Sequence, residues 1–312
     1  MPEGELHPDL ELLLEFYHRQ RSAPPDAFAH SPGLMPSPDF FSIEKLQAHL
    51  NNPLLTPDWI ALAARGQFVP LEPAYMFKDV QNKQLFFMDK ALIDQHLREG
   101  AALLLEGLDV LDASINAFAA RVDAALPCAL TNVVAFFSQR GNEAYKGHAD
   151  LDDVLVVHIE GEKRWSLFEP RPRKLKDKGG LTKEQMGRQI GEVMMRPGDA
   201  LYVRAGIPHI CQTTGECSLH LSFDLRDRTL SVKQITEEAN TRYAAAAAAP
   251  YAEPSKVIEK YVELLTSEKF QSDVAAATSQ IRDDALGFRR RIGKTSVVRA
   301  LSKFAAATRG PR

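Results

Sequence analysis

Short apolar runs separated by turns follow one another from Pro127 to Leu225. They read LTNVVAFFS, VLVVHIEG, EKRWSLFEP, GEVMMRPGDALYVRAG and ECSLHLSFDL. Regularly spaced short strands with Gly and Pro between them favour an antiparallel sandwich or barrel. This stretch constrains the fold more than any other, and it predicts a mainly β core that the segments on either side extend with helices.

Helical patterns lie on both sides of the β-rich stretch. Before it, DLELLLEFYHRQR is amphipathic, FSIEKLQAHL has a Ser in capping position, and MDKALIDQHLREG leads into a buried strand, ALLLEG. QFVPL, PAYMF and QLFFM indicate short strands, whereas the Pro-rich segment SAPPDAFAHSPGLMPSP is a connection with too many breakers for a helix. Apolar residues at helical spacing return after Arg226. We therefore expect an N-terminal elaboration over 1–85, a β core over 86–225 and a helical region over 226–312.

Composition places the chain among ordinary globular proteins. Its 312 residues are 45% apolar and 25% charged, which suffices to bury a core. No apolar run reaches the roughly eighteen residues of a membrane span. Cys128, Cys211 and Cys217 match no zinc or redox spacing, and the amino terminus shows no cleavable leader. We therefore expect a cytoplasmic protein with no membrane partner.

Charge is distributed unevenly along the chain. Residues 226–312 hold 16 Lys and Arg against 10 Asp and Glu, a charge of +6, whereas residues 1–225 hold 22 against 31, a charge of −9. Such a split indicates an anionic partner for the basic part, or attraction between the two parts in a dimer. No nucleic-acid-binding motif accompanies the basic residues, so nucleic acid is not an expected partner.

Three polar residues near the strand ends form the most informative pattern. His148 and Asp150, in YKGHADLDD, are two positions apart, so extended backbone puts both side chains on one face. His209, in RPGDALYVRAGIPHICQ, follows a strand and a turn of small residues. Each residue alone would more often belong to a loop. Together, two imidazoles and a carboxylate form the ligand set of non-haem Fe(II) oxygenases, which keeps open positions for a cosubstrate and dioxygen.

Lys163 adds a positive charge to the same region. On the strand that follows VLVVHIEG it shares a face with Trp165 and Leu167, where a charge is disfavoured unless it is paired. An inward Lys requires an anion, and a carboxylate-bearing cosubstrate would supply one. The alternative is a surface Lys on an edge strand. His158 is expected in the core or behind the ligands, because no carboxylate stands at a suitable spacing.

These motifs resemble the Jumonji-C family of Fe(II)- and 2-oxoglutarate-dependent oxygenases, and most closely its ribosomal-oxygenase branch. The similarity runs from about Phe86 to Leu225, with FFMDKALIDQHLREGAALLLEGLD similar to the branch's lead-in. It implies a double-stranded β-helix, the jelly-roll of cupins, with N-terminal helices and a C-terminal helical region that forms a homodimer.

The resemblance also implies roles for individual residues. His148, Asp150 and His209 fall on the iron ligands, and Lys163, fifteen positions after the first ligand, falls on the Lys that pairs with the distal carboxylate of 2-oxoglutarate. Asn132, in TNVVAFF, falls beside the cosubstrate. Trp165, on the face of Lys163, is assigned to the same cosubstrate site.

Two positions depart from the branch. Val134 stands where a Tyr often follows the Asn by two residues, so one phenolic contact with the cosubstrate is missing. Asp224 stands near the position of a Ser close to 2-oxoglutarate, where a carboxylate would repel the dianion; Ser222 or a water would then make that contact. If Lys163 does not bind the cosubstrate, Arg140 or Arg204 is the next candidate.

The implied activity is that of a dioxygenase. It would use Fe(II), 2-oxoglutarate and O2 to hydroxylate an amino-acid side chain of a protein, such as a ribosomal protein, or of a peptide. The acidic charge of residues 1–225 favours a basic substrate surface. Two alternatives stay open: a biosynthetic 2-oxoglutarate hydroxylase acting on a peptide natural product or small molecule, and a metal-binding cupin enzyme that does not use 2-oxoglutarate.

Overall fold

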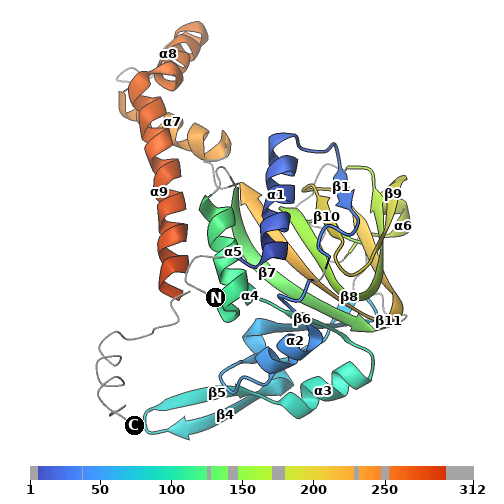
Figure 1. The fold of residues 1–312 in the computed structure, drawn as a ribbon. Coiled ribbons are helices and arrows are strands. Elements are labelled where there is room, and N and C mark those ends of the chain that lie inside the picture. Colours follow the sequence, from blue (N-terminus) through green and yellow to red (C-terminus); the bar gives the residue numbers. More distant parts are fainter. Residues whose placement is uncertain are drawn as a thin grey trace, which may run out of the picture. The chain divides into compact units, whose positions relative to one another are not determined.

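The computed structural model describes residues 6–36, 38–124, 128–139, 147–170, 180–227, 232–246 and 253–292. The chain divides into two compact units, Met1–Arg121 with Leu130–Arg226, and Val122–Ala129 with Asp227–Arg312. The first unit is rich in strands and the second in helices (Figure 1). Arg140 and the apolar run VVRALSKF near the end of the chain lie outside the described residues.

One nine-stranded sheet makes up most of the first unit. Its hydrogen-bonded order is β1-β10-β8-β11-β7-β6-β2-β3, with β9 paired to β8 off this path. Each strand pairing that the structure describes is antiparallel, so the predicted mainly antiparallel β core is confirmed. The strands are β1 (Phe28–Ser31), β2 (Ile60–Ala64), β3 (Gln67–Phe68), β6 (Ala102–Leu105), β7 (Cys128–Gln139), β8 (Asp153–Phe168), β9 (Gln189–Met195), β10 (Ala200–Val203) and β11 (His209–Asp227).

The two longest strands, β8 and β11, bend together. They pair along both halves, with a register shift between Thr213 and Ser218. Gly161 lies at this bend with φ 73°, and a Cβ there would come within 1.9 Å of the Cys217 carbonyl oxygen. Before the bend β8 also pairs with β10, and after it with β9. Residues of both halves line one cavity, so the bend folds the strand pair back on itself.

The second half of β11 alternates between two environments. Leu219, Leu221 and Phe223 are buried, and the Phe223 ring makes an edge contact with Phe118 of helix α5 (Ala113–Ala124), with centroids 5.0 Å apart. The residues that alternate with them, His220, Ser222 and Asp224, face the opposite side of the strand and line the cavity. An apolar cluster packs around that cavity inside the barrel: Val154, Val156, Trp165, Leu167, Val193, Met195, Leu201, Val203 and Ile207.

The helices of the first unit begin where the sequence places caps. Ser42 Oγ accepts a hydrogen bond from the Lys45 backbone N–H at the start of α2 (Ile43–Leu50), and Asp89 caps α3 (Lys90–Arg98) in the same way. The amphipathic segment forms α1 (Pro8–Ser22). The remaining elements of this unit are η1 (Pro57–Trp59), η2 (Glu72–Ala74), the hairpin β4 (Tyr75–Val80) and β5 (Lys83–Met88), α4 (Leu108–Leu111) and α6 (Lys183–Met186).

The Pro-rich connection is only partly irregular. It contains β1, which pairs residue by residue with β10, from Phe28 opposite Val203 to Ser31 opposite Ala200. The sequence predicted a connection with too many breakers for a helix, and it did not predict this strand. Local composition disfavours a long helix here, but an edge strand draws its hydrogen bonds from a neighbour far away in sequence, which local composition does not reveal.

The second unit contains α7 (Val232–Ala246), α8 (Pro254–Thr266) and α9 (Glu268–Ile292). Arg242 of α7 donates a hydrogen bond of 2.6 Å to Asp273 of α9, and its guanidinium lies 5.2 Å from the centre of the Phe270 ring. At the far end of α9, Arg289 forms a buried ion pair with Asp123. None of the helices in the described ranges is long and apolar enough to cross a bilayer.

Candidate active site

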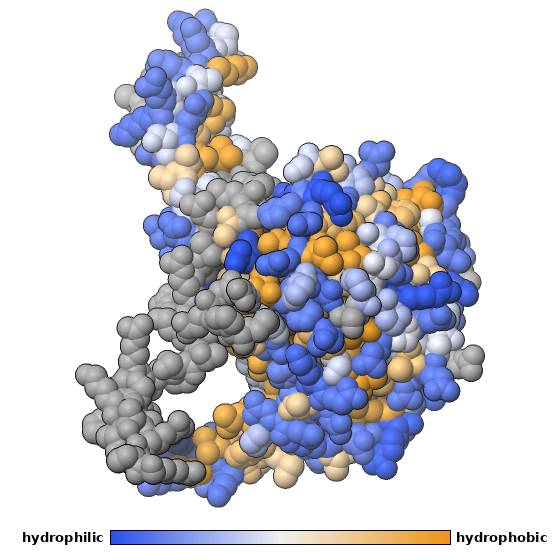
Figure 2. Space-filling view, in the orientation of Figure 1, coloured by the Kyte–Doolittle hydropathy of each residue, from blue (hydrophilic) through white to orange (hydrophobic). Residues whose placement is uncertain are grey.

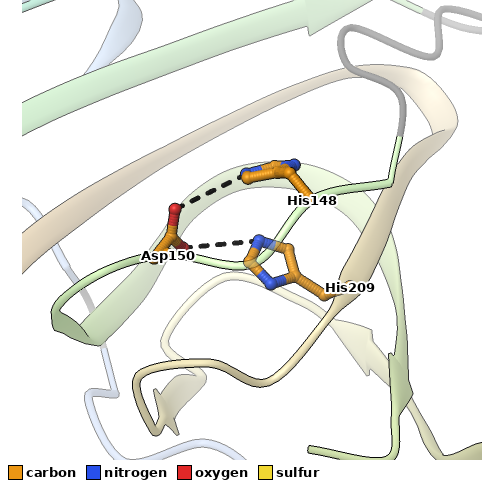
Figure 3. Close-up of side chains that lie close together, drawn as sticks. All are labelled: His148, Asp150 and His209. Carbon is orange, nitrogen blue, oxygen red and sulfur yellow. Dashed lines mark ion pairs between the residues drawn. The ribbon is translucent and has the colours of Figure 1, made fainter. Parts of the chain in front are cut away.

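The three predicted ligands converge at one point (Figure 3). One nitrogen or carboxylate oxygen from each of His148, Asp150 and His209 lies within 4.8 Å of the others. The Asp150 oxygens lie 3.7 Å from His148 Nε2 and 3.6 Å from His209 Nε2, longer than hydrogen bonds. A metal about 2 Å from each donor fits between groups that face one another at such spacings.

Backbone pairing fixes the two imidazoles beside each other. His148 and His209 form an antiparallel bridge, in which the His209 N–H donates to the His148 carbonyl at 2.8 Å and the His148 N–H donates back at 3.2 Å. The ring centroids are 4.4 Å apart. Asp150 is held from the other side, because the Gly206 N–H donates to its carbonyl oxygen at 2.9 Å. Residues 56 or more positions apart in the sequence are thus joined by main-chain hydrogen bonds.

His209 has the protonation state that a metal ligand needs. Its Nδ1 donates to the Ile207 carbonyl oxygen at 3.1 Å, which leaves Nε2, the atom that faces Asp150, as the lone-pair nitrogen. Burial, followed by the neighbouring His148, lowers the pKa of His209 to about 4. The imidazole is therefore neutral at physiological pH, as metal ligation requires. Two imidazole nitrogens and one carboxylate form a ligand set that suits Fe(II).

A cavity of about 140 Å³ extends from the three ligands into the barrel. Phe136 of β7, Trp165 of β8 and Cys211 of β11 contribute to its walls. The Trp165 ring stacks on His209 with centroids 5.2 Å apart and an angle of 28°. Burial raises the pKa of the Cys211 thiol to about 12, so this wall is neutral.

Lys163 lies inside the barrel and lines this cavity, with a residual exposure of 2%. The alternative of a surface Lys on an edge strand is therefore wrong. Its Nζ donates to Ser138 Oγ at 3.2 Å, and Ser138 Oγ lies 2.7 Å from Thr213 Oγ1. Burial lowers the pKa of Lys163 to about 8. An ammonium group surrounded by hydroxyls in an apolar interior is suited to bind a carboxylate.

Two buried histidines, His220 and His158, stack on one another at the cavity wall. Only His158 was considered from the sequence. His220 lines the cavity and stacks on Phe136, with centroids 4.9 Å apart and the planes 2° from parallel. His158 stacks behind His220 and lies in the core, where its Nε2 donates to the Gly161 carbonyl at 3.1 Å. Burial lowers both pKa values, that of His158 to about 4. His220 could have been found from its alternation with Leu219 and Leu221.

The other predicted site residues divide into two groups. Trp165 and Ser222 line the cavity with the metal ligands, and so do the two departures, Val134 and Asp224. Asn132 is not among the described residues that line it: its amide oxygen accepts a hydrogen bond of 3.0 Å from the Gly107 N–H. Arg204, the reserve candidate for the cosubstrate, is exposed and is likewise absent from the described lining.

Asp224 gives one end of the cavity an acidic character. Burial raises its pKa to about 7, and the charges of Asp150, Asp152 and Glu106 act in the same direction. Arg226 opposes this effect but also makes two hydrogen bonds of 3.0 Å to Asp152. A carboxyl group in this position is sensitive to the charge of whatever enters the cavity.

Comparison with known proteins supports the resemblance seen in the sequence. The family model of the JmjC domain matches residues 110–232, a range that contains the three predicted metal ligands and Lys163. The bifunctional lysine-specific demethylase and histidyl-hydroxylase NO66 of Aedes aegypti is 31% identical over 101 residues, which are 31% of this chain and 16% of that protein. Ribosomal oxygenase 2 of Bos taurus is 27% identical over 96 residues, 30% of this chain and 21% of that protein. The chain thus spans less than a quarter of these curated relatives.

Solved structures share the fold. The X-ray structure of ycfD from Escherichia coli superposes with a TM-score of 0.52 at 15% identity, covering 81% of this chain and 68% of that one. A structure of the same ribosomal oxygenase in complex with cobalt and 2-oxoglutarate gives a TM-score of 0.50 at 14% identity, with coverages of 84% and 70%. The predicted JmjC-type β core with helical extensions is confirmed.

Proposed function

We propose that the chain, whose residues 110–232 match the family model of the JmjC domain, is an Fe(II)- and 2-oxoglutarate-dependent dioxygenase that hydroxylates an amino-acid side chain of a protein. One observation carries the proposal: the cavity that His148, Asp150 and His209 border also contains the buried ammonium group of Lys163. A metal site alone would not need that charge, so Lys163 favours a 2-oxoglutarate enzyme over a cupin that binds metal only.

We assign each group of residues in the cavity its own role. His148, Asp150 and His209 would hold Fe(II) through one donor atom each. Lys163, supported by Ser138, would bind the distal carboxylate of 2-oxoglutarate. When bound, the iron and cosubstrate supply the oxidation of a substrate C–H bond by O2, which releases succinate and carbon dioxide. The apolar walls of the cavity would exclude water and so strengthen the interaction of Lys163 with the distal carboxylate of 2-oxoglutarate.

The proposed substrate class rests on the relatives. NO66 is named as a histidyl-hydroxylase and lysine-specific demethylase, and the bovine relative as a ribosomal oxygenase. These names support a protein substrate, such as a ribosomal protein, over the peptide natural product or small molecule of the alternative proposal. Asn132 is proposed to act indirectly, through the loop at Gly107 that it holds, and Ser222 and Trp165 to border the cosubstrate.

We also propose a cytoplasmic homodimer. Cys211 and Cys217 are free thiols, as expected in a reducing compartment. On α8, Ile258 and Val262 are 64% and 51% exposed and lie four residues apart, on one face of the helix. Figure 2 shows apolar atoms along one side of the helical unit. A second copy of this chain would cover them, and the opposite charges of residues 1–225 and 226–312 favour such pairing.

Turnover of 2-oxoglutarate tests the proposed function. The purified chain loaded with Fe(II) should convert 2-oxoglutarate to succinate, and mass spectrometry should find a product with one added oxygen among ribosomal proteins. His148→Ala or Asp150→Ala should abolish both results and leave the fold intact, because a ligand at an open cavity contributes little packing. Asp79→Ala, on the exposed hairpin, is the control for loss of a carboxylate. Full activity in either ligand variant would refute the assignment.

A further inference from the structure

A second group of side chains that can bind a metal lies at the start of α1, outside the cavity. His7, Asp9 and Asp39 each offer one donor atom, and these three atoms lie within 4.8 Å of one another. His7 caps the helix and Asp9 belongs to its first turn, whereas Asp39 lies in the segment before α2. All three belong to the first compact unit. The fold therefore brings together donors from two separate segments.

The Asp9 carboxylate is buried without the partners that a buried charge needs. The residue is 6% exposed, and its Oδ2 has no hydrogen-bond partner among the described residues. The N–H groups of the first helical turn do not serve it, because those of Asp9, Leu10 and Glu11 donate to His7. Burial, opposed by His7 and reinforced by Asp39, raises the pKa of Asp9. Since an unpaired buried carboxylate is costly, a cation beside it would stabilise the fold.

His7 and Asp39 supply the other two donors. His7 Nε2 lies 2.8 Å from Asp39 Oδ1, and the imidazole packs beside the Phe40 ring, with centroids 5.9 Å apart. The Asp39 side chain is 71% exposed, so the group opens to solvent on this side. A cation would replace the proton that His7 Nε2 shares with Asp39. The bond given up is weak, because His7 Nδ1 accepts from the Asp9 N–H at 3.3 Å, a long distance.

The donor set decides the class of cation. Two carboxylates carry two negative charges, which a divalent cation would cancel. The opposing positive end of the helix dipole is equivalent to only roughly half a charge. An imidazole nitrogen favours a transition metal over Mg(II) or Ca(II), which prefer oxygen. Zn(II) lies about 2 Å from His nitrogen and Asp oxygen, and a small movement of the exposed Asp39 side chain would bring the donors to that distance.

We propose that His7, Asp9 and Asp39 form a second metal site, which takes Zn(II), with water in the fourth position. The ion neutralises the buried Asp9 carboxylate and ties the start of α1 to the segment before α2. The site is structural, because none of its three residues is among the described residues that line the active-site cavity. It is independent of the proposed function.

Counting of bound zinc tests the site. The full chain, stripped of metal by a chelator, is dialysed against micromolar Zn(II) with millimolar Mg(II), which competes for sites made of oxygen only. Atomic absorption should find two zinc ions per native chain, one at each group of ligands. Asp39→Asn should keep one, and so should Asp9→Asn. Glu11→Gln removes an exposed carboxylate from the same helical turn and should keep both.

A further variant separates this site from the candidate active site. His148→Ala should lose the other ion and keep the one at α1. Equal zinc in the native chain and in Asp39→Asn would overturn the inference, whatever the native count. Because Asp39 is exposed, that variant should fold even if Asp9→Asn does not. Equal zinc in the native chain and in His148→Ala would instead contradict the metal site of the proposed function.

Discussion

Lys163 carries a buried positive charge that does not stabilise the folded chain. Its described partner is a neutral hydroxyl, that of Ser138, and burial lowers its pKa from 10.5 to about 8. A buried ammonium group without an anion destabilises the fold. This cost to stability fits the proposed role of Lys163 in binding an anion, and it should be measurable in the absence of cosubstrate.

Lys163→Met should stabilise the chain without cosubstrate at pH 7. The folded pKa of about 8 lies below the unfolded value of 10.5, so the unfolded chain holds the proton more tightly. This destabilisation is complete below about pH 8 and is relieved as the pH rises to 10.5. The variant should gain up to about 3 kcal/mol in urea unfolding at pH 7, and less at each higher pH. Lys78→Met, on the exposed hairpin, should gain nothing. A destabilised Lys163→Met variant at pH 7 would contradict this account.

Lys163→Ala should weaken the binding of 2-oxoglutarate far more than that of the prime substrate. Loss of one partner of a buried charge pair costs roughly 3 to 5 kcal/mol, so the apparent KM for the cosubstrate should rise by a factor of a hundred or more. Steady-state kinetics with each substrate varied in turn measures both constants. Arg204→Ala removes an exposed cation outside the described lining and should leave both constants unchanged. An unaltered cosubstrate KM in Lys163→Ala would move the anion site elsewhere.

At the scale of the elements, the bend of β8 and β11 builds the cavity. Gly161 permits the bend because it takes a positive φ, and because its α-carbon lies too close to the Cys217 carbonyl to carry a side chain. Two residues later in β8 comes Lys163, and on the facing strand Thr213 and Ser218 flank the register shift. The position of Lys163 in the cavity thus depends on one glycine.

Gly161→Ala should destabilise the chain by about 2 to 4 kcal/mol, because strain at positive φ adds to a clash with rigid backbone. Gly33→Ala is the control: its φ is 59°, but a Cβ there would meet no atom within 4 Å, so only the conformational cost of about 1 kcal/mol applies. Thermal unfolding of both variants measures the difference. Equal losses in the two would show that the close approach at the bend is not rigid.

At the scale of the whole molecule, the helical unit exposes apolar side chains that the proposed dimer would cover. Ile258 and Val262 are exposed although α8 packs with α7 through the Tyr261 hydroxyl, which donates to the Thr236 carbonyl at 3.2 Å. The first unit already closes its own core around Trp165 and its neighbours. A twofold dimer would bury these apolar stripes reciprocally.

Light scattering coupled to gel filtration should give twice the single-chain mass of 34.7 kDa at micromolar concentration. Ile258→Ser combined with Val262→Ser should shift the chain toward the monomer, whereas Lys256→Ser, at an exposed polar position of the same helix, should not. A single-chain mass for the native protein would refute the dimer. A truncation after Leu225 that stays soluble and active would show that the helical unit is dispensable.

The sequence by itself determined the residue types of the site. The alternation of extended backbone placed His148 and Asp150 on one face, and a strand followed by a tight turn identified His209. The spacing from His148 to Lys163 identified the fourth residue once the resemblance was recognised. These signals are local, because side-chain direction in a strand repeats every two residues whatever the strand pairs with.

The tertiary structure alone decided which residues meet. Ser138 and Thr213 carry no local mark of a site, yet strand pairing brings Ser138 to Lys163 and Thr213 to Ser138. Asp224 lines the same cavity as Lys163, although the sequence suggested that a carboxylate there would repel the cosubstrate. Long-range strand pairing fixes such positions, and the register of that pairing follows from how whole faces pack, which no short stretch of residues encodes.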